Sequence, residues 1–316
     1  MKIAVLVPVY NAERYLAECL DSLLGQDVDV FCCDDGSTDG SRKILEAYAR
    51  KTSRLRFVMQ PNAGVVAARN RLMDELPPEY GAFAFCDADD LVRTGMYARL
   101  AEALERTDAD VAESGMPGNE VGRETVVDDM SVYWLRRTAP GPWINVVNKL
   151  YRRSAVGSVR FRAGLRFEED FFFNYEINAA IRRKVLLPGI DYMYRTNPDS
   201  ATRSLNHRRY FESASERIRL SCEVFWKTGR IPARLRPAFL AELSKDAYRM
   251  CLRKNLKKNR AATLRRELFS AAGDFFAMLE RDFGFVPTGL NPLQRVIWSC
   301  CRRGAYRTAR ILSFLT

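Results

Sequence analysis

"IAVLVPV", residues 3–9, is an unbroken run of mostly aliphatic residues, which is typical of a strand buried on both faces of a parallel sheet. The next stretch, "NAERYLAECLDSLLGQ" (11–26), places its apolar residues on one helical face, and we expect Asn11 to cap this helix and Gly25 to end it. "VDVFCCDDGSTDGS" (28–41) returns to a strand and finishes in a polar turn that contains glycine. The order strand, helix, strand predicts a right-handed crossover between parallel strands.

The same alternation continues toward the middle of the chain. We expect a helix at 41–51, a strand at 55–60, a second helix at 64–76 and a strand at 83–86. Repeated units of this kind predict an α/β fold with a mostly parallel sheet flanked by helices. In such sheets, ligands bind at the carboxyl ends of the strands.

Length and composition are those of an ordinary globular protein. The chain has 316 residues, of which 47% are hydrophobic and 28% are charged, so it can form a large core and is long enough for two domains. Its eight cysteines form no C-x-x-C pattern, which favours a reduced, cytosolic protein. We also expect neither a removable signal peptide nor a membrane-spanning helix, because the N-terminal apolar segment lacks a cleavage site and no apolar run reaches 18 residues.

Charge is distributed unevenly along the sequence. Residues 1–202 contain 26 Lys+Arg and 30 Asp+Glu, whereas residues 203–316 contain 24 Lys+Arg and 9 Asp+Glu. The C-terminal third therefore carries a net charge of +15, whereas residues 1–202 carry −4, which together give the +11 of the whole chain. Such a surplus favours an anionic partner, which could be a membrane surface, a phosphorylated acceptor or a nucleic acid.

Three polar turns follow strands of the predicted sheet. They are "VYNAE" (9–13), "DDGSTDGS" (34–41) and "DADD" (87–90). Each turn alone has a simple explanation, because Asp-Gly-Ser turns are common in loops and acidic residues often end a strand at the surface. Parallel strands, however, bring all three turns to one edge of the sheet, so together they predict a binding site.

The last of these turns places three carboxylates within four positions, at Asp87, Asp89 and Asp90. Carboxylates this close together repel one another, which raises their pKa values unless a cation or basic side chains neutralise them. A divalent cation is the simplest neutralising group.

Four segments, taken in order, resemble the successive motifs of glycosyltransferase family 2. They are "VPVYNAERYLAECLDSLLGQ" (7–26), "DDGSTDGS" (34–41), "NAGVVAARN" (62–70) and "CDADD" (86–90). The resemblance covers roughly residues 1–200 and implies a GT-A fold and an enzyme that uses nucleotide-diphosphate sugars. We therefore expect a GT-A catalytic domain over residues 1–205 and a basic helical region over residues 206–316.

The resemblance also implies which residues bind the nucleotide-sugar donor. Tyr10 and Asp35 match positions that contact the base, most often uracil, by stacking and by accepting the imide N–H. The remaining donor-site matches are Pro8, Asn11, Asn62, Arg69 and Asp87.

The "DADD" segment matches the DxD motif, whose carboxylates bind Mg²⁺ or Mn²⁺ and contact the ribose. Asp89 is our first choice as a metal ligand, and the order of Asp87 and Asp90 as ribose contact and second ligand is left open. Oxygen ligands suit both metals.

"LRFEEDFFFN" (165–174) resembles the family segment that supplies the general base. On that match Asp170 deprotonates the acceptor hydroxyl and the anomeric carbon is inverted, with Glu169 as the alternative base. The same acidic residues also suit a helix N-terminus, and the two roles are compatible.

Four further residues have more than one possible role. Trp143 and Lys149 could contact the acceptor or the diphosphate, or could be structural. Arg203 could bind the diphosphate from a loop that closes over the donor. His207 matches a position that binds the metal in some relatives, although a surface histidine among arginines is the better prediction.

Helical patterns fill the rest of the chain, and the last of them interleaves apolar residues with arginines over 290–316. Such a helix could bind the inner face of the cell membrane as a peripheral protein, or could simply pack with its basic face in solvent. The family resemblance favours the membrane and a saccharide or lipid-linked saccharide acceptor in surface polysaccharide synthesis. A homodimer through these helices is left open, and no nucleic acid is expected. The alternative function is a catalytically inactive transferase-like module that delivers the basic region to a membrane or another anionic partner.

Overall fold

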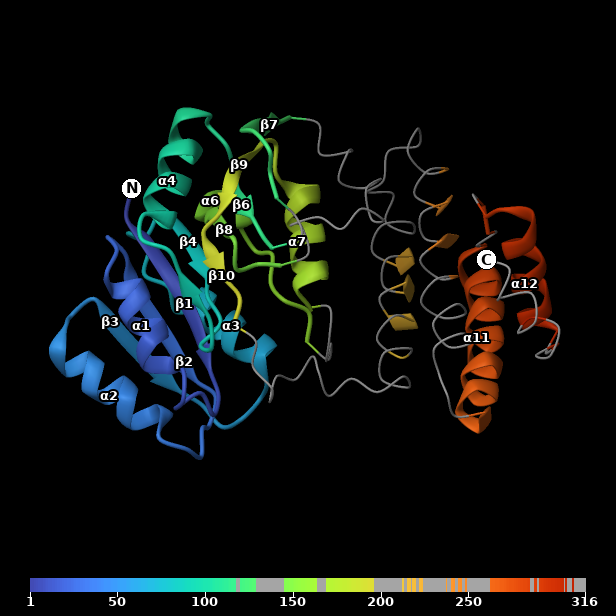
Figure 1. Cartoon of the computed structure of the whole chain (residues 1–316), viewed down its shortest axis with the longest axis horizontal. Coiled ribbons are helices and arrows are strands. Elements are labelled where there is room, and N and C mark those ends of the chain that lie inside the picture. The colour runs from blue at the N-terminus through green and yellow to red at the C-terminus, as the bar shows by residue number, and fades with distance from the viewer. Residues whose placement is uncertain are drawn as a thin grey trace. The chain divides into compact units, whose positions relative to one another are not determined.

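The computed structural model describes residues 1–117, 120–128, 145–163, 169–195, 262–284, 287–288, 290–303, 305 and 309, with isolated positions between 212 and 248. Eight strands between Ile3 and Ile190 form one sheet with the order β3-β2-β1-β4-β8-β6-β9-β7 (Figure 1). The mostly parallel sheet flanked by helices that the sequence predicts is confirmed.

The N-terminal half of the sheet is parallel throughout. It contains β1 (Ile3–Val9), β2 (Asp29–Asp34), β3 (Leu55–Met59) and β4 (Ala82–Phe85). The side chains of β1 from Ala4 to Val7 are completely buried, as its aliphatic sequence predicts for a central strand. All four strands therefore end at the same edge.

The other half is mixed. The strand β8 (Lys149–Arg152) runs antiparallel to both β4 and β6 (Val111–Gly115). The strand β9 (Lys184–Ile190) is parallel to β6, and β7 (Thr125–Val127) pairs with β9 antiparallel. A separate two-stranded ribbon forms from β5 (Leu91–Val92) and β10 (Tyr192–Met193), directly after the "DADD" segment.

Helices cover the sheet in two groups, which lie on opposite sides of it in Figure 1. One group contains α1 (Leu16–Leu24), α2 (Ser41–Lys51) and α4 (Met96–Arg106), and the other contains α3 (Val65–Asp74) and α7 (Glu169–Ala180). The short helix α6 (Arg153–Val156) follows β8. The first turn of α7 is acidic, as the sequence predicts for this helix start.

The start of α1 differs from the sequence prediction. Asn11 does not cap the helix, because α1 begins only at Leu16 and Tyr15 precedes it without a side-chain cap. Asn11 instead has a positive φ of 47°, and its side chain accepts a hydrogen bond from the amide of Thr38. Asparagine tolerates this backbone region better than most residues, so the turn after β1 bends toward the turn after β2. The predicted end of the helix at Gly25 is confirmed.

An aromatic cluster fills the core between β4 and α7. The Phe85 ring makes edge contacts with Phe161 at 5.3 Å and with Phe173 at 5.8 Å, and these two rings stack on each other at 4.1 Å between centroids. Such packing fixes α7 against the sheet, because offset and edge-to-face ring pairs prefer specific geometries.

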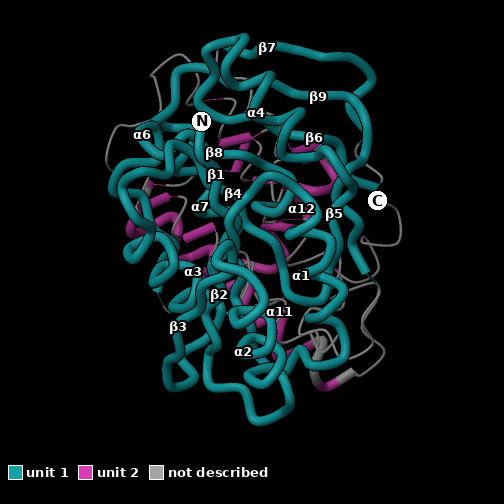
Figure 2. Tube along the Cα trace, turned by 90° about the vertical axis from the view of Figure 1, so that its left-hand side faces the viewer, with its two compact units in different colours: residues 1–130, 140–197 teal, residues 131–139, 198–316 magenta. Residues whose placement is uncertain are grey.

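The chain divides into two compact units, coloured separately in Figure 2: residues 1–130 with 140–197, and residues 131–139 with 198–316. The sequence-based boundary at residue 205 lies outside the described residues. In the second unit, α11 (Ala262–Phe283) packs on α12 (Pro292–Arg302) through stacking of Phe276 on Trp298. Within the part of the chain that the structure describes, no helix is long and apolar enough to cross a membrane.

Candidate functional site

The turns after β1 and β2 are joined by hydrogen bonds at the carboxyl edge of the sheet. The amide of Asn11 donates to the hydroxyl of Ser37 over 3.0 Å, and the amide of Ala12 donates to Ser41 over 2.8 Å. These hydrogen bonds hold the two turns in place against each other. Tyr10 lies beside them with 51% of its surface exposed, so its ring is accessible to a ligand.

Asp35 holds the segment that leads into α3. Its carboxylate accepts hydrogen bonds from the side chain of Gln60 at 2.7 Å and from the amides of Ala63 and Gly64 at 2.9 and 2.8 Å. A carboxylate has about four acceptor positions, so three bonds leave room for one more donor, such as the imide N–H of a base. The predicted contact with the base stays a prediction.

Gly36 allows this segment to approach closely. It has a φ of +76°, and a Cβ atom at this position would lie 2.8 Å from the amide nitrogen of Asn62. A larger residue would be strained and would displace the exposed Asn62 from the edge of the sheet. The glycine of "DDGS" is thus required by the backbone.

Arg69 lies at the centre of the candidate site. Its guanidinium donates to Asp87 at 2.9 Å, to Asp170 at 2.5 Å and to Glu169 at 3.3 Å, while only 4% of the side chain is exposed. It also stacks over the Phe161 ring at 5.3 Å. Burial by itself would lower the pKa of Arg69, but the carboxylates of Asp170, Asp87 and Glu169 raise it well above its ordinary value.

This arrangement brings the predicted donor and base residues together. Asp87 follows β4, whereas Glu169 and Asp170 form the first turn of α7, and Arg69 of α3 contacts all three. The two sets of carboxylates are separated by about eighty positions in the sequence, yet one guanidinium contacts both. Sequence analysis assigned Arg69 to the donor site and did not identify its contact with the base.

The two candidate bases have raised pKa values. Burial, followed by the charge of Asp170, raises the pKa of Glu169 to about 7, although Arg69 opposes the shift. Burial also raises the pKa of Asp170, again opposed by Arg69. One Asp170 oxygen contacts Arg69, and the other accepts a weak hydrogen bond from the amide of Val146 at 3.4 Å. About a fifth of the side chain is exposed, so a substrate can reach it.

The three carboxylates of "DADD" have different surroundings. Asp87 and Asp89 are partly exposed at the end of β4, whereas Asp90 is completely buried. Asp90 accepts hydrogen bonds from the hydroxyl of Tyr192 at 2.6 Å and from the amide of Arg195 at 2.7 Å. Burial raises the pKa of Asp90 to about 7. Its oxygens therefore hold the β10 segment, and Asp87 and Asp89 suit metal binding better.

Asp87 and Asp89 are the carboxylates at this edge that could hold a divalent cation. Among the described residues, no group of three or more histidine, cysteine, aspartate or glutamate side chains is arranged to hold a metal ion. Mg²⁺ is commonly bound by one or two carboxylates together with substrate phosphates, and Asp87 and Asp89 supply that number.

Some predicted residues lie outside the described part of the chain, and others were missed. Trp143, Arg203 and His207 belong to the first group. Sequence analysis missed Glu113 and Tyr192, which are both fully buried. A charged residue within a short apolar stretch, such as Glu113 in "DVAESG", is a signal that could have identified the first of them.

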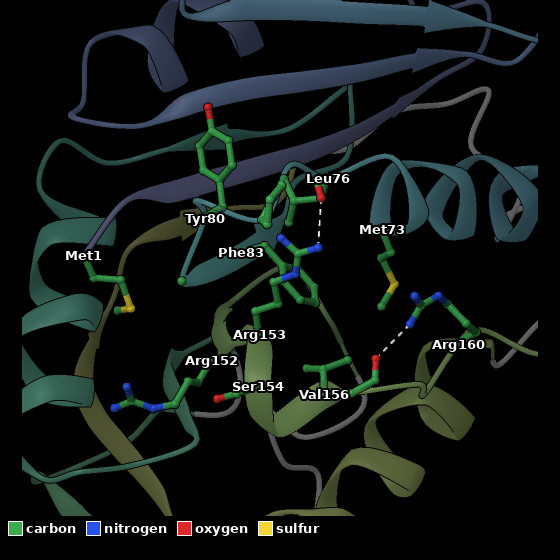
Figure 3. Close-up of a pocket in the computed structure, with 13 residues that line it drawn as sticks. Met1, Met73, Leu76, Tyr80, Phe83, Arg152, Arg153, Ser154, Val156 and Arg160 are labelled. Carbon is green, nitrogen blue, oxygen red and sulfur yellow. Dashed lines mark hydrogen bonds between the residues drawn. The ribbon is translucent and has the colours of Figure 1, made fainter.

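A cavity of about 540 Å³ lies elsewhere, beside the residues that precede β1 and β4 (Figure 3). Arg153 lines it and donates to the carbonyl of Leu76, and Arg160 donates to the carbonyl of Gly157 (Figure 3). Arg153 also donates to the carbonyl of Pro77. These arginines fix loops at the amino ends of the parallel strands. The cavity is therefore separate from the candidate site, which lies at the carboxyl ends.

Comparisons with known proteins agree on one family. The family model described as Glycosyl transferase family 2 matches residues 4–186. The glycosyltransferase EpsJ of Bacillus subtilis (strain 168), described as uncharacterized, is 33% identical over 63% of this chain and 62% of its own length. The poly(ribitol-phosphate) beta-glucosyltransferase of Bacillus spizizenii is 28% identical over 61% of this chain and 32% of its own length. The chain thus covers less than two-thirds of these curated relatives.

A solved structure shows the same fold. The crystal structure of residues 1–349 of S. aureus TarS in complex with UDP-GlcNAc superposes with a TM-score of 0.73. The alignment covers 99% of this chain and 90% of that one, with 21% sequence identity.

Proposed function

Because this chain belongs to glycosyl transferase family 2, we propose that it moves a sugar from a nucleotide-diphosphate sugar to a hydroxyl group of a saccharide or lipid-linked saccharide. The observation that carries the proposal is the contact of Arg69 with Asp87 on one side and with Glu169 and Asp170 on the other. The proposed donor-binding carboxylate and the candidate base therefore lie close to each other. Direct transfer requires the donor and the acceptor to meet in this way.

A UDP-sugar is the proposed donor. The accessible ring of Tyr10 can stack on the base, and Asp35, which follows β2 at the same edge of the sheet, has one acceptor position left for an N–H of the base. The TarS structure was solved with UDP-GlcNAc, which supports a uridine donor for this chain as well. Asp87 and Asp89 would hold Mg²⁺ or Mn²⁺, and the bound metal would stabilise the negative charge of the departing diphosphate.

Asp170 is the proposed general base. Its raised pKa brings it closer to neutral pH, where a carboxylate is a more effective proton acceptor. Arg69 keeps it ionised before the reaction, because the adjacent positive charge favours the carboxylate form. Removal of the acceptor proton by Asp170 as the hydroxyl attacks the anomeric carbon gives inversion. Glu169 is the alternative base.

We further propose a cytoplasmic protein at the inner face of the cell membrane, acting in surface polysaccharide synthesis. The relatives' names and the net charge of residues 203–316 support this location. In α12, Ile297 and Trp298 are buried, so the proposed membrane contact depends on its exposed arginines rather than on these two residues. A homodimer stays a prediction.

Calorimetric titration with a panel of nucleotide-sugars, with and without Mn²⁺, tests the proposal. Metal-dependent binding of one UDP-sugar, followed by release of UDP in the presence of acceptor saccharides, is the expected result. If folded protein binds none of the donors, either alone or with acceptor present, the transferase proposal is wrong and the inactive binding module becomes the better description.

A further inference from the structure

A buried ionic cluster lies in the sheet beside the candidate base. Lys149 of β8 and Lys184 of β9 both contact the same carboxylate oxygen of Glu113, at 3.6 and 3.0 Å. Glu113 and Lys149 are completely buried, and Lys184 is 1% exposed. Buried ions are costly to desolvate and add little net stability, so such a cluster calls for another explanation.

Lys149 directs its ammonium group back toward the segment that precedes β8. Its Nζ donates to the carbonyl of Asn145 and to the side chain of Asn148, the latter at 2.9 Å. The side chain of Asn148 in turn donates to the carbonyl of Ser114 on β6. These bonds tie residues 145–148 to the sheet.

The same segment contacts the first turn of α7. The side-chain amide of Asn174 donates both to the Asn145 carbonyl, at 3.2 Å, and to the carbonyl of Asp170, at 3.0 Å. The amide of Val146 donates to the carboxylate of Asp170. Lys149 and Asn174 therefore share one acceptor, and a continuous path of hydrogen bonds joins the buried cluster to the candidate base.

We propose that Lys149 is a positioning residue for Asp170. It holds residues 145–146 against α7, so that the Val146 amide and Arg69 together fix the two oxygens of the Asp170 carboxylate. Lys149 does not touch the substrate in this role. The inference rests on the proposed function, because it takes Asp170 to be the general base.

The chain offers a matched control in Lys184. It pairs with the same Glu113 oxygen, but it does so from β9, on the opposite side of β6 from β8. Lys149→Met and Lys184→Met each remove one ammonium group from the cluster at nearly constant volume. A purely structural role for the cluster predicts similar effects of the two substitutions on activity.

The first readout is steady-state release of UDP from the UDP-sugar selected by the titration, with water or saccharide as acceptor. We expect Lys149→Met to lower kcat by about 10- to 100-fold, since small displacements of a catalytic group cost that much. The donor KM should stay within about twofold, and Lys184→Met should keep kcat within about threefold. An unchanged kcat in Lys149→Met, or equal losses in both variants, overturns the proposal.

The second readout does not depend on activity. Hydrogen exchange followed by mass spectrometry should show faster exchange at residues 145–148 and 169–174 in Lys149→Met than in Lys184→Met. Equal exchange in the two variants contradicts the positioning role. If the wild-type protein transfers no sugar, the proposed function fails, whereas the exchange data still decide whether Lys149 holds the segment.

A second variant covers the case in which Lys149→Met does not fold. Asn174→Leu removes the amide that joins Asn145 to Asp170 and leaves the ionic cluster intact. We expect the same loss of kcat with unchanged donor KM. Wild-type kcat in folded Asn174→Leu would overturn the proposed path.

Discussion

Arg69 stabilises three carboxylates that come from two distant parts of the sequence, and it does so while almost fully buried. Its ion pairs should contribute more to stability than those on the surface of the same helix. The nearby pair of Arg71 with Glu75 is solvent-exposed, and pairs of that kind contribute little because water screens them.

Replacing Arg69 should therefore destabilise the protein far more than replacing Arg71. We expect Arg69→Met to lower the free energy of unfolding by about 3–5 kcal/mol, because it leaves three partly buried carboxylates close together without a counter-charge. Arg71→Met should cost no more than about 1 kcal/mol. Urea denaturation of both variants measures the difference, and similar losses would contradict the central role of Arg69.

Asp170 should be required for catalysis and not for donor binding. We expect Asp170→Asn to lower kcat by about 10²- to 10⁴-fold, the usual contribution of a general base, with the calorimetric affinity for the donor nearly unchanged. Glu169→Gln serves as the comparison, since Glu169 contacts the same guanidinium. Wild-type turnover in Asp170→Asn would show that the base is another residue.

Lys149 should make stability depend on pH above neutrality. Burial lowers its pKa from 10.5 to about 8, although Glu113 opposes the shift. Between pH 8 and 10.5 the unfolded chain therefore binds more protons at this residue than the folded protein, so its contribution to stability rises with pH. The pKa difference corresponds to about 3 kcal/mol at most.

The measurement is the difference in unfolding free energy between the wild-type protein and Lys149→Met, followed from pH 7 to 10.5. Other titrating groups are common to the two proteins and cancel. The difference should shift in favour of the wild-type protein as the pH rises. A constant difference would mean that Lys149 keeps an ordinary pKa in the folded protein.

At the scale of elements, Tyr192 is one of the residues that hold the short β5/β10 ribbon beside the sheet. The hydroxyl of Tyr192 donates to Asp90 at 2.6 Å and accepts from the amide of Asp87 at 3.2 Å. It therefore connects the ribbon both to the buried carboxylate and to the backbone that carries a proposed metal ligand.

Tyr192→Phe should weaken this connection without changing the core volume. We expect a loss of about 1–3 kcal/mol in unfolding free energy, because a buried carboxylate oxygen loses its donor. Tyr194→Phe is the control, since Tyr194 is 56% exposed and its substitution should change stability by no more than about 0.5 kcal/mol. Thermal denaturation distinguishes the two variants. Wild-type stability in Tyr192→Phe would contradict the role of Tyr192 in holding the ribbon.

The elements that local patterns describe well were predicted correctly, and the contacts between distant elements were not. The aliphatic run of residues 3–9 forms β1, and the glycine of "DDGS" forms a tight turn, because both depend on local backbone preferences. The mutual contacts of Arg69 and Asp170 depend on how α3 and α7 pack, 101 positions apart. Asn11 was wrongly predicted as a helix cap, because the bonds that determine its backbone come from Ser37 and Thr38.

At the scale of the whole molecule, two forms of the membrane proposal can be compared: insertion of apolar side chains of α12 into the membrane, and attraction of basic side chains to anionic lipid. The packing of α11 on α12 and the charge surplus of residues 203–316 distinguish between them. Ile297 and Trp298 of α12 are buried, whereas Arg295 of α12 and Arg303, which directly follows the helix, are exposed. An electrostatic contact with anionic lipid is therefore the version of the membrane proposal that fits the described residues.

Substituting those arginines should weaken binding to anionic liposomes. Each basic residue near such a surface contributes about 1 kcal/mol, so Arg295→Gln with Arg303→Gln should lower the affinity by about tenfold or more. The control pair Lys43→Gln and Arg50→Gln removes two exposed charges from α2 and should have little effect. Co-sedimentation at low and high salt measures both, and equal binding by the two variants would remove the proposed role of α12.

The sharing of Arg69 between two sides of the site also limits how this protein can be recombined with its relatives. A chimera that receives its acceptor region from another transferase would replace α7 and keep α3 and β4. Unless the incoming helix brings a carboxylate to the position of Asp170, the site would lack its proposed base and Arg69 would lose one of its partners. We therefore expect successful exchanges of the acceptor region to keep the carboxylates of α7 unchanged.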